Sequence, residues 1–356
     1  MSALPARPAT STSYRPELDA FRVLPVLMVI AQHWLPVPWV RTATSSVGVT
    51  TFFVLSGYFV TNILRRAQAS AQPWRVLKPF YLRRSLRILP AFYAALLAAW
   101  LLNLSFVREY LGWFALQGAN FLFFSKQAWG EGVGHWWSLA VEEQFYLLWP
   151  ALVLLVGVRR LPWLLGALVV LGPVLRWYLL AATGTSFSLV LLPAHLDVFA
   201  LGGLLGLAMA GPQPFGFRSW AIGFAILLPA YVLLKHLGGH PELVLAPSLL
   251  ALLAACALGM ILLTPSTAAR KVLSHPVLVW VGQRSYGLYL YHLFMPVLLH
   301  RVLHRVAPAY ATAAWEQSPL ALLLMAAGLL IVASVSWSWL ERPLRRLGQR
   351  FAYPRG

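Results

Sequence analysis

The chain has 356 residues, of which 60% are hydrophobic and only 11% are charged. Soluble domains carry about 25% charged residues, and so large an apolar surplus cannot be buried in one or two soluble cores. The composition therefore excludes an ordinary soluble protein and predicts an integral membrane protein. The net charge of +18 does not indicate nucleic-acid binding, because no basic domain stands apart from the apolar segments.

Apolar segments of about 18–24 residues recur along the chain, close to the ~20 residues that a helix needs to cross hydrocarbon. They lack the strict alternation of barrel strands. The sequence therefore predicts an all-α fold, a polytopic membrane bundle of about ten transmembrane helices. Segment 110–124 is apolar but short, and we expect it to be interfacial or re-entrant. The expected spans are residues 23–40, 47–64, 88–106, 138–158, 161–180, 190–210, 219–236, 243–263, 277–300 and 319–340.

The basic residues are distributed unevenly between the two sides of this bundle. With the N-terminus placed inside, 20 of the 28 Lys and Arg residues fall on the cytoplasmic side, 6 on the outer side and 2 within spans. Lys and Arg accumulate in cytoplasmic loops of membrane proteins. The distribution predicts that both termini are cytoplasmic.

No long polar segment separates the spans, which predicts a single transmembrane domain over residues 14–345. A disordered Pro/Ala-rich tail, residues 1–13, precedes it, and a basic cytoplasmic tail, residues 346–356, follows it. Cys256 is the only cysteine, so no disulfide or cysteine-based zinc cluster can form within the chain. No set of His, Asp and Glu has a recognisable ligand spacing, and no metal is expected.

An arginine and a histidine lie on one stripe of the first expected span. Arg22 and His33 are eleven residues apart, which places them within about 20° of one helix face and roughly 16 Å apart along it. Asp19 is spaced to pair with Arg22. His33 would suit proton abstraction near neutral pH. The alternative is a histidine bonded to a neighbouring helix and an arginine that only anchors the cytoplasmic end.

Segment 65–87 holds seven basic residues and no acidic one. Arg84 and Arg87 are three residues apart and would share a face if a helix begins there. Two guanidinium groups suit phosphate oxygens, which predicts a phosphorylated cytosolic ligand. The alternative is that this segment only sets the topology and contacts lipid head groups.

Polar residues also enter two later spans. Ser138, Glu142 and Tyr146 share one helical face at four-residue spacing, and Glu143 points about 100° away. An aromatic belt would explain the neighbouring Trp and Tyr residues but not the two carboxylates. Near the end of the chain, Ser285 and His292 share another face. Intramembrane counter-charges are available from His195, Asp197 and Arg284.

Five motifs follow one another along nearly the whole chain: Arg22 followed after ten residues by His33, segment 48–58, Arg84 with Arg87, segment 137–146, and segment 285–292. In this order they resemble the motifs of the acyltransferase 3 family of membrane acyltransferases, and segment 341–343 also fits. Departures are small: Ala20 and Phe21 stand where Gly and Leu are usual, and Thr50 stands where an acid is frequent.

The resemblance implies transfer of an acyl group, commonly acetyl from acetyl-CoA, to a hydroxyl group. The implied acceptors are cell-envelope polysaccharides, lipid-linked glycans and glycosylated small molecules. The donor is a substrate, so no permanently bound cofactor is implied. The partners would be acyl-CoA, the acceptor and membrane lipids. The implied location is a bacterial inner membrane.

The resemblance also assigns roles to residues. His33 becomes the general base and faces the cavity that the donor enters, with Glu142 orienting it or binding the acceptor. The CoA phosphates would be held by Arg22, Arg84 and Arg87. The remaining candidates for substrate binding are Asp19, Ser138, Glu143, Tyr146, Ser285 and His292.

Two other classes of protein remain open at this stage. Many spans with intramembrane charges and interrupted helices also describe a transporter or flippase without acyl-transfer chemistry. A structural membrane scaffold would need neither chemistry nor transport.

Overall fold

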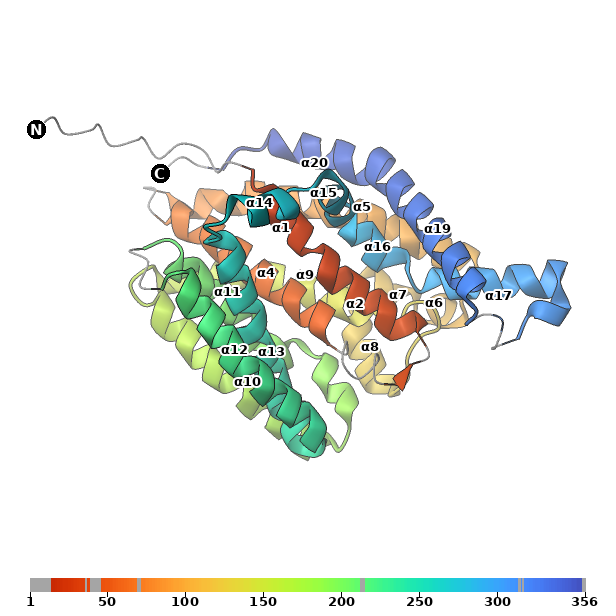
Figure 1. Ribbon diagram of the computed structural model, residues 1–356, viewed down its shortest axis with the longest axis horizontal. Coiled ribbons are helices and arrows are strands. Elements are labelled where there is room, and N and C mark those ends of the chain that lie inside the picture. Colours follow the sequence, from red (N-terminus) through yellow and green to blue (C-terminus); the bar gives the residue numbers. More distant parts are fainter. Residues whose placement is uncertain are drawn as a thin grey trace, which may run out of the picture.

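The computed structural model describes residues 14–35, 37–38, 46–68, 72–211, 215–312, 315 and 317–353. The described residues form helices joined by turns and loops, and they contain no strand (Figure 1). Short 3-10 helices lie at Pro73–Val76, Ser186–Val190, Leu192–His195 and Pro308–Tyr310, and a π-helical turn lies at Trp337–Glu341. The α-helices are α1 (Pro16–Phe21), α2 (Val23–Trp34), α4 (Val47–Ala67), α5 (Leu77–Leu101), α6 (Ser105–Glu109), α7 (Leu111–Ala115), α8 (Ala119–Lys126), α9 (Trp136–Val156), α10 (Leu161–Thr183), α11 (Leu196–Ala208), α12 (Phe217–Leu237), α13 (Gly239–Leu262), α14 (Thr267–Leu273), α15 (Pro276–Gln283), α16 (Ser285–Tyr291), α17 (Phe294–Val306), α19 (Pro319–Ser336) and α20 (Arg342–Gln349).

Seven helical stretches in the described part of the chain are long and apolar enough to cross a membrane. The all-helical, multi-pass prediction is confirmed, but the predicted count of about ten spans is not. The segment expected at 23–40 contains the 12-residue helix α2, and that at 190–210 holds the short apolar helix Leu192–Ala208. The seven stretches are Val47–Ala67, Pro73–Leu101, Trp136–Val156, Leu161–Thr183, Phe217–Leu237, Gly239–Leu262 and Pro319–Gln349.

The span expected at 277–300 is broken into α15, α16 and α17, and side chains explain both breaks. In a continuous helix the carbonyl of Trp280 would accept from the backbone N–H of Arg284. Here the Arg284 guanidinium donates to that carbonyl at 3.0 Å, and its backbone N–H bonds Val281 instead. At the second break Pro296 has no N–H to give to the carbonyl of His292. The Trp34 indole donates to that carbonyl at 3.1 Å.

Helices α4 and α11 pack with their backbones close together. A Cβ atom added to Gly202 would collide with the carbonyl oxygen of Val54, and one added to Gly57 with that of Phe199. Gly202 and Gly206 have the four-residue spacing of small residues that lets membrane helices approach. This contact brings α4 into the centre of the bundle, where its opposite side reaches the cavity described below.

A buried ion pair ties α10 to α11. Arg176, 1% exposed, binds both carboxylate oxygens of Asp197 at 2.8 Å, and Asp197 is fully buried. Further donors of Arg176 bond the carbonyls of Ala194 and Val244 and the hydroxyl of Ser248 on α13. The counter-charge expected from Asp197 is therefore used by Arg176. The Arg284 guanidinium stacks on Trp280 at 3.8 Å.

Two more features concern the ends and one edge of the bundle. The first described residues of α1 and the last of α20 lie at the same end of the bundle as α14 (Figure 1). That this end is cytoplasmic remains a prediction.

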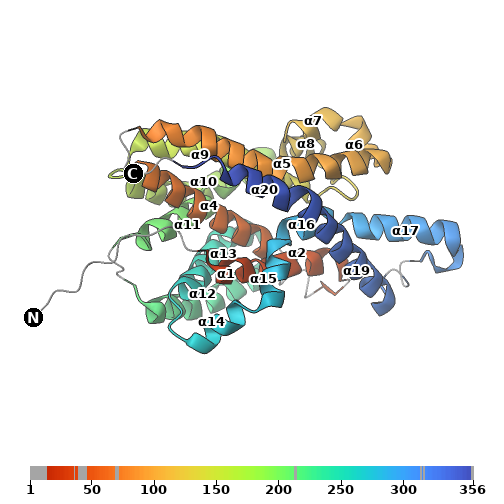
Figure 2. The same ribbon diagram turned by 90° about the horizontal axis from the view of Figure 1, so that it is seen from above.

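Helices α6 to α8 form a group of short helices at one edge of the bundle (Figure 2). Asn120 on α8 and Gln144 on α9 exchange amide hydrogen bonds at 2.9 and 3.1 Å, which attaches this group.

The domain limits expected from the sequence are not tested by these observations. Residues 1–13 lie outside the described residues. The limit expected at residue 345 falls inside α20, which packs on α5. Arg83 of α5 also lies over the ring of Tyr353 at 4.5 Å.

We expect Gly202→Ala to destabilise the bundle by about 1–3 kcal/mol, because a methyl group has no room between α4 and α11. Thermal unfolding in detergent, followed by circular dichroism, measures this. Gly166→Ala on α10 is the matched control, because a Cβ at that position meets no atom within 4 Å. Equal midpoints for the two variants would contradict the close packing.

Candidate functional site

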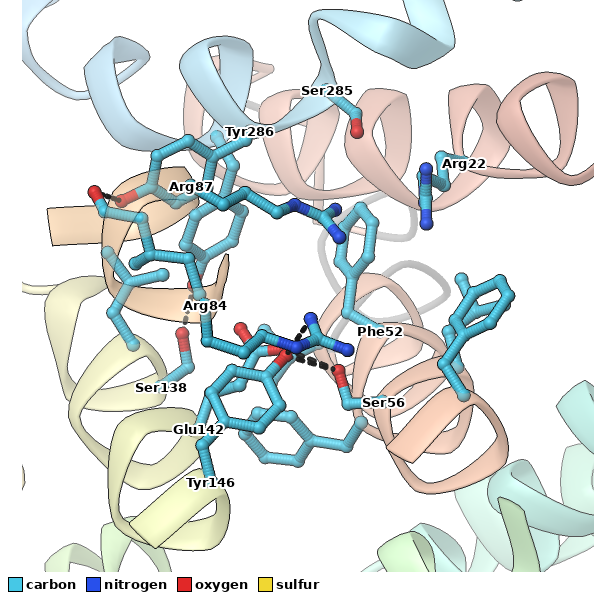
Figure 3. Close-up of a pocket in the computed structure, with 17 residues that line it drawn as sticks. Arg22, Phe52, Ser56, Arg84, Arg87, Ser138, Glu142, Tyr146, Ser285 and Tyr286 are labelled. Atoms are coloured by element: carbon cyan, nitrogen blue, oxygen red, sulfur yellow. Dashed lines mark hydrogen bonds between the residues drawn. The ribbon is translucent and has the colours of Figure 1, made fainter. Parts of the chain in front are cut away.

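A cavity lies between the α1–α2 junction and helices α4, α5, α9 and α16, and encloses about 710 Å³ including its open part (Figure 3). Apolar side chains, among them Phe52, Phe59 and Ile88, form much of its wall. Seven of the polar residues predicted from the sequence line it: Arg22, Arg84, Arg87, Ser138, Glu142, Tyr146 and Ser285.

Three arginine side chains open to this cavity. Arg22 forms an ion pair with Asp19 at 2.7 Å, as its spacing predicts. Arg84 stacks on the ring of Tyr146 at 4.5 Å and donates to its hydroxyl at 3.2 Å. Arg87 makes no hydrogen bond or ion pair with another described residue. The cavity therefore carries guanidinium donors for which no described residue supplies an acceptor, and such donors suit an anionic ligand.

Arg84 and Arg87 lie on a longer helix than the sequence predicted. Segment 65–87 was expected to be a loop, but α4 extends to Ala67 and α5 begins at Leu77. The expected boundaries are wrong by several residues, because basic residues continue both helices beyond their apolar parts. The early start of α5 puts Arg84 and Arg87 on one helical face, and both side chains point into the cavity (Figure 3).

Opposite the arginines, three side chains from two helices share hydrogen bonds. Ser56 of α4 and Tyr146 of α9 both donate to the same carboxylate oxygen of Glu142. The hydroxyls of Ser56 and Tyr146 lie 2.9 Å apart. The acid that the sequence placed in the membrane thus has partners inside the bundle. Glu142 is expected from the sequence to orient His33 or to bind the acceptor; in the structure its Oε1 accepts the hydrogen bonds of these two hydroxyls.

One wall of the cavity separates it from a group of histidines. Ser138 and Tyr289 line the cavity and are hydrogen-bonded to each other. The Tyr289 hydroxyl also donates to the carbonyl of His135 at 3.0 Å. The Tyr289 ring contacts His135 and His292, with centroids 5.3 and 5.7 Å away. Tyr289 therefore lies between the cavity and the histidines.

The histidine group contains His33, His135 and His292. His292 is fully buried, and its Nδ1 lies 2.7 Å from the carbonyl of Tyr289, so this nitrogen carries the proton. Its Nε2 then accepts from Nδ1 of His33 at 3.2 Å, and the same Nδ1 lies 2.8 Å from the carbonyl of Val29. A proton on Nδ1 of His33 places the basic lone pair of neutral His33 on Nε2.

Four predicted residues do not line the cavity with the arginines. Asp19 is 4% exposed and lies behind Arg22, to which it is bonded. His33 is exposed and contacts His292. Glu143 lines a separate groove with Gln144 and residues of α7 and α8. The sequence therefore identified most of the polar residues of the site. It assigned them to one cavity, whereas the structure distributes them among the arginine cavity, the groove at Glu143 and the histidine group.

Three residues of these clusters, Ser56, His135 and Tyr289, were not among the predicted site residues. Ser56 lies within the recognised segment 48–58, and its hydroxyl had no visible partner in the sequence. His135 precedes α9, is 4% exposed, and its ring lies 4.5 Å from that of His292. Ser56 and Tyr289 lie inside the recognised segments 48–58 and 285–292, which was the available signal, whereas His135 lies two residues before segment 137–146. The partners of Ser56 and His135, Glu142 and His292, are 86 and 157 positions away in the chain.

The fold and the cavity define a class: a multi-pass helical membrane protein whose bundle holds a cavity lined by three arginines. A family model described as an acyltransferase domain matches residues 15–340. The chain belongs to this family, acyltransferase 3.

Similar proteins carry names consistent with that family. The chain is 31% identical to the peptidoglycan O-acetyltransferase OatA of Listeria monocytogenes, with 95% of this chain and 57% of that protein aligned. It is 29% identical to the putative peptidoglycan O-acetyltransferase YrhL of Bacillus subtilis, over 95% and 56% of the two chains. The chain thus spans a little more than half the length of these relatives. No solved structure matches it.

Proposed function

We propose that the protein is an O-acyltransferase of the bacterial inner membrane. It transfers an acyl group, acetyl in the simplest case, from cytosolic acyl-CoA to a sugar hydroxyl of a cell-envelope glycan. The observation that carries this proposal is the convergence of Arg22, Arg84 and Arg87 on one cavity in a chain of the acyltransferase 3 family. The names of the relatives, peptidoglycan O-acetyltransferases, support a glycan acceptor.

The donor half of the proposal rests on charge. A buried cation without a partner is costly in a membrane protein, so an open arginine is retained where a ligand supplies the anion. Arg87 and the part of the Arg84 guanidinium not used by Tyr146 are directed into the cavity. The phosphates of CoA match such donors in charge and geometry. The thioester would then reach toward Glu142 and Tyr289.

The acceptor half rests on the histidine group. His33 is exposed, and the Val29 carbonyl, 2.8 Å from its Nδ1, holds the proton there and leaves the lone pair on Nε2. In this proposal His33 removes the proton of the acceptor hydroxyl, and His292 is a positioning residue. Because Ser138 and Tyr289 lie between this group and the cavity, these two side chains must separate when the acceptor meets the acyl group.

One experiment tests the function as a whole. Membranes that contain the protein are incubated with isotopically labelled acetyl-CoA, and the labelled product is identified by mass spectrometry. Labelled glycan and free CoA are expected. Solute uptake or lipid translocation without consumption of acetyl-CoA would instead favour a transporter or flippase.

The double variant Arg84→Ala/Arg87→Ala is expected to bind CoA at least about tenfold more weakly, because two charge-assisted phosphate contacts are lost. Isothermal titration calorimetry on protein in nanodiscs measures the affinity. Raised salt should weaken binding by the wild type more steeply than binding by the variant, since screened charge pairs contribute less.

Arg83→Ala is the matched control, because Arg83 lies on the same helix but contacts Tyr353 and does not line the cavity. Its CoA affinity should stay within about twofold of the wild type, a change of less than 0.5 kcal/mol. An unchanged affinity in the Arg84/Arg87 double variant would reject the donor site.

His33→Ala should lower acyl transfer by about 10²–10⁴-fold, the contribution typical of a general base, while CoA affinity stays unchanged. His292→Ala should retain part of the activity and change the pH profile of kcat, because the His33 ring loses its contact with His292 while the Val29 carbonyl still holds the proton on its Nδ1. Acetyl transfer to a glycan acceptor at several pH values measures both effects.

His236→Ala is the histidine control, since His236 is exposed near the end of α12. Its transfer rate and pH profile should match those of the wild type. Normal transfer by the His33 variant would exclude the proposed base, and an unaltered pH profile in the His292 variant would exclude the positioning role.

A further inference from the structure

Ser56 and Glu142 form the pairing of a hydroxyl with a base that nucleophilic catalysis requires. Ser56 is 7% exposed and lines the cavity, and its hydroxyl donates directly to the Glu142 carboxylate. A serine hydroxyl is a weak nucleophile until an adjacent base takes its proton. No other serine that lines the cavity is hydrogen-bonded to a carboxylate among the described residues: Ser138 bonds His135 and Tyr289.

The surroundings of this pair suit attack on a thioester. Arg84 lies against Tyr146, which bonds both members of the pair, so positive charge stands next to the reacting oxygen. Guanidinium N–H groups aimed into a cavity can stabilise the oxyanion that forms when a carbonyl is attacked. Ser56 and the three arginines line the same cavity (Figure 3). A donor held by these arginines would therefore place its thioester carbon in the cavity that the Ser56 hydroxyl lines.

The position of His33 creates a need for such a nucleophile. His33 does not line the cavity, and Tyr289 lies between the cavity and the histidine group. A one-step transfer would require the acceptor, its base and the thioester to meet while CoA still occupies the cavity. A covalent intermediate removes this requirement, because CoA can leave before the acceptor arrives.

We propose that Ser56 carries the acyl group between donor and acceptor, with Glu142 as its base; this rests on the proposed acyl-CoA-dependent function. The Ser56 oxygen forms a bond to the acyl carbon as its proton passes to Glu142, and the carbon–sulfur bond breaks. CoA leaves as the thiolate and is protonated by solvent. The product is an ester on Ser56.

The second half-reaction regenerates the serine. The acceptor oxygen bonds to the acyl carbon while its own proton passes to the acceptor base, His33 in the proposed function. The bond between that carbon and the Ser56 oxygen breaks, and this oxygen takes the proton held by Glu142. His33 then releases its proton to the surroundings, so that no further reactant is consumed.

Tyr146 is the competing nucleophile, because its hydroxyl also donates to Glu142. Its ring is held between other groups: Arg84 stacks on one side, and the rings of Phe80 and Phe145 lie 6.5 and 5.6 Å away. Its hydroxyl also accepts from Arg84. These contacts fix Tyr146 as a support for the pair, whereas Ser56 has a short side chain that forms no such stack.

The test uses the full chain in nanodiscs with radiolabelled acetyl-CoA and no acceptor. After denaturation, we expect label that stays on the protein, is released by hydroxylamine and maps to the Ser56 peptide by mass spectrometry. Ser56→Ala should lose this label and at least about 100-fold of the acyl-transfer rate while it still binds CoA. Glu142→Gln, which keeps a similar shape but cannot take the proton, should form label at least about tenfold more slowly.

Thr51→Val is the control for folding, because Thr51 lies on the same helix, bonds only the carbonyl of Val47 and does not line the cavity. It should be labelled as the wild type is. Transfer by the wild type without any covalent label, label on Tyr146, or a normal rate in Ser56→Ala would overturn the role of Ser56. A wild type that neither binds acetyl-CoA nor transfers acetyl would instead contradict the proposed function itself.

Discussion

The free-energy cost of holding guanidinium groups inside an apolar bundle governs how this structure is built. Arg176 shows one solution: every donor direction is used, by both oxygens of Asp197, two carbonyls and Ser248. Arg87 shows the other, since its guanidinium faces a cavity and has no hydrogen-bond partner among the described residues. A closed arginine such as Arg176 links three helices, whereas an open one such as Arg87 leaves its donors available for the anionic donor proposed above.

A second constraint is that Tyr289 separates two groups of polar side chains. On one side lie the three arginines and the hydroxyl and carboxylate groups of α4 and α9. On the other, hydrogen bonds link His33 to His292, and His135 lies against His292. The hydroxyl of Tyr289 bonds Ser138 on the cavity wall and the carbonyl of His135. A reaction that uses both groups must proceed in stages or move this tyrosine.

The segment 277–300 is broken at both ends of α16. A straight helix over residues 277–300 would carry Ser285 and His292 on one face, as the sequence suggested. The breaks beside Arg284 and at His292 end α16 after two turns and let the His292 carbonyl bond Trp34 of α2. Ser285, at the start of α16, lines the arginine cavity, and His292, directly after its end and two turns away, faces His33. Side chains that take backbone carbonyls, together with Pro296, redirect the chain here.

Local patterns in the sequence determined much of this protein. The length of the apolar segments predicted the helical membrane fold. Residue spacing predicted the Asp19–Arg22 pair and the shared face of Arg84 and Arg87, and the order of the motifs indicated the family. These features depend on residues within a turn or two of one another, where helix geometry fixes which side chains meet.

Only the tertiary structure decided which distant side chains meet. Ser56 and Glu142 are 86 positions apart, and His33 and His292 are 259 apart. Their contacts depend on how α4 packs on α11 through glycine and on where the helix over 277–300 breaks. Helical periodicity gives the direction of a side chain around its own axis but not the partner helix it faces. The separation of His33 from the arginine cavity was therefore beyond what periodicity alone could supply.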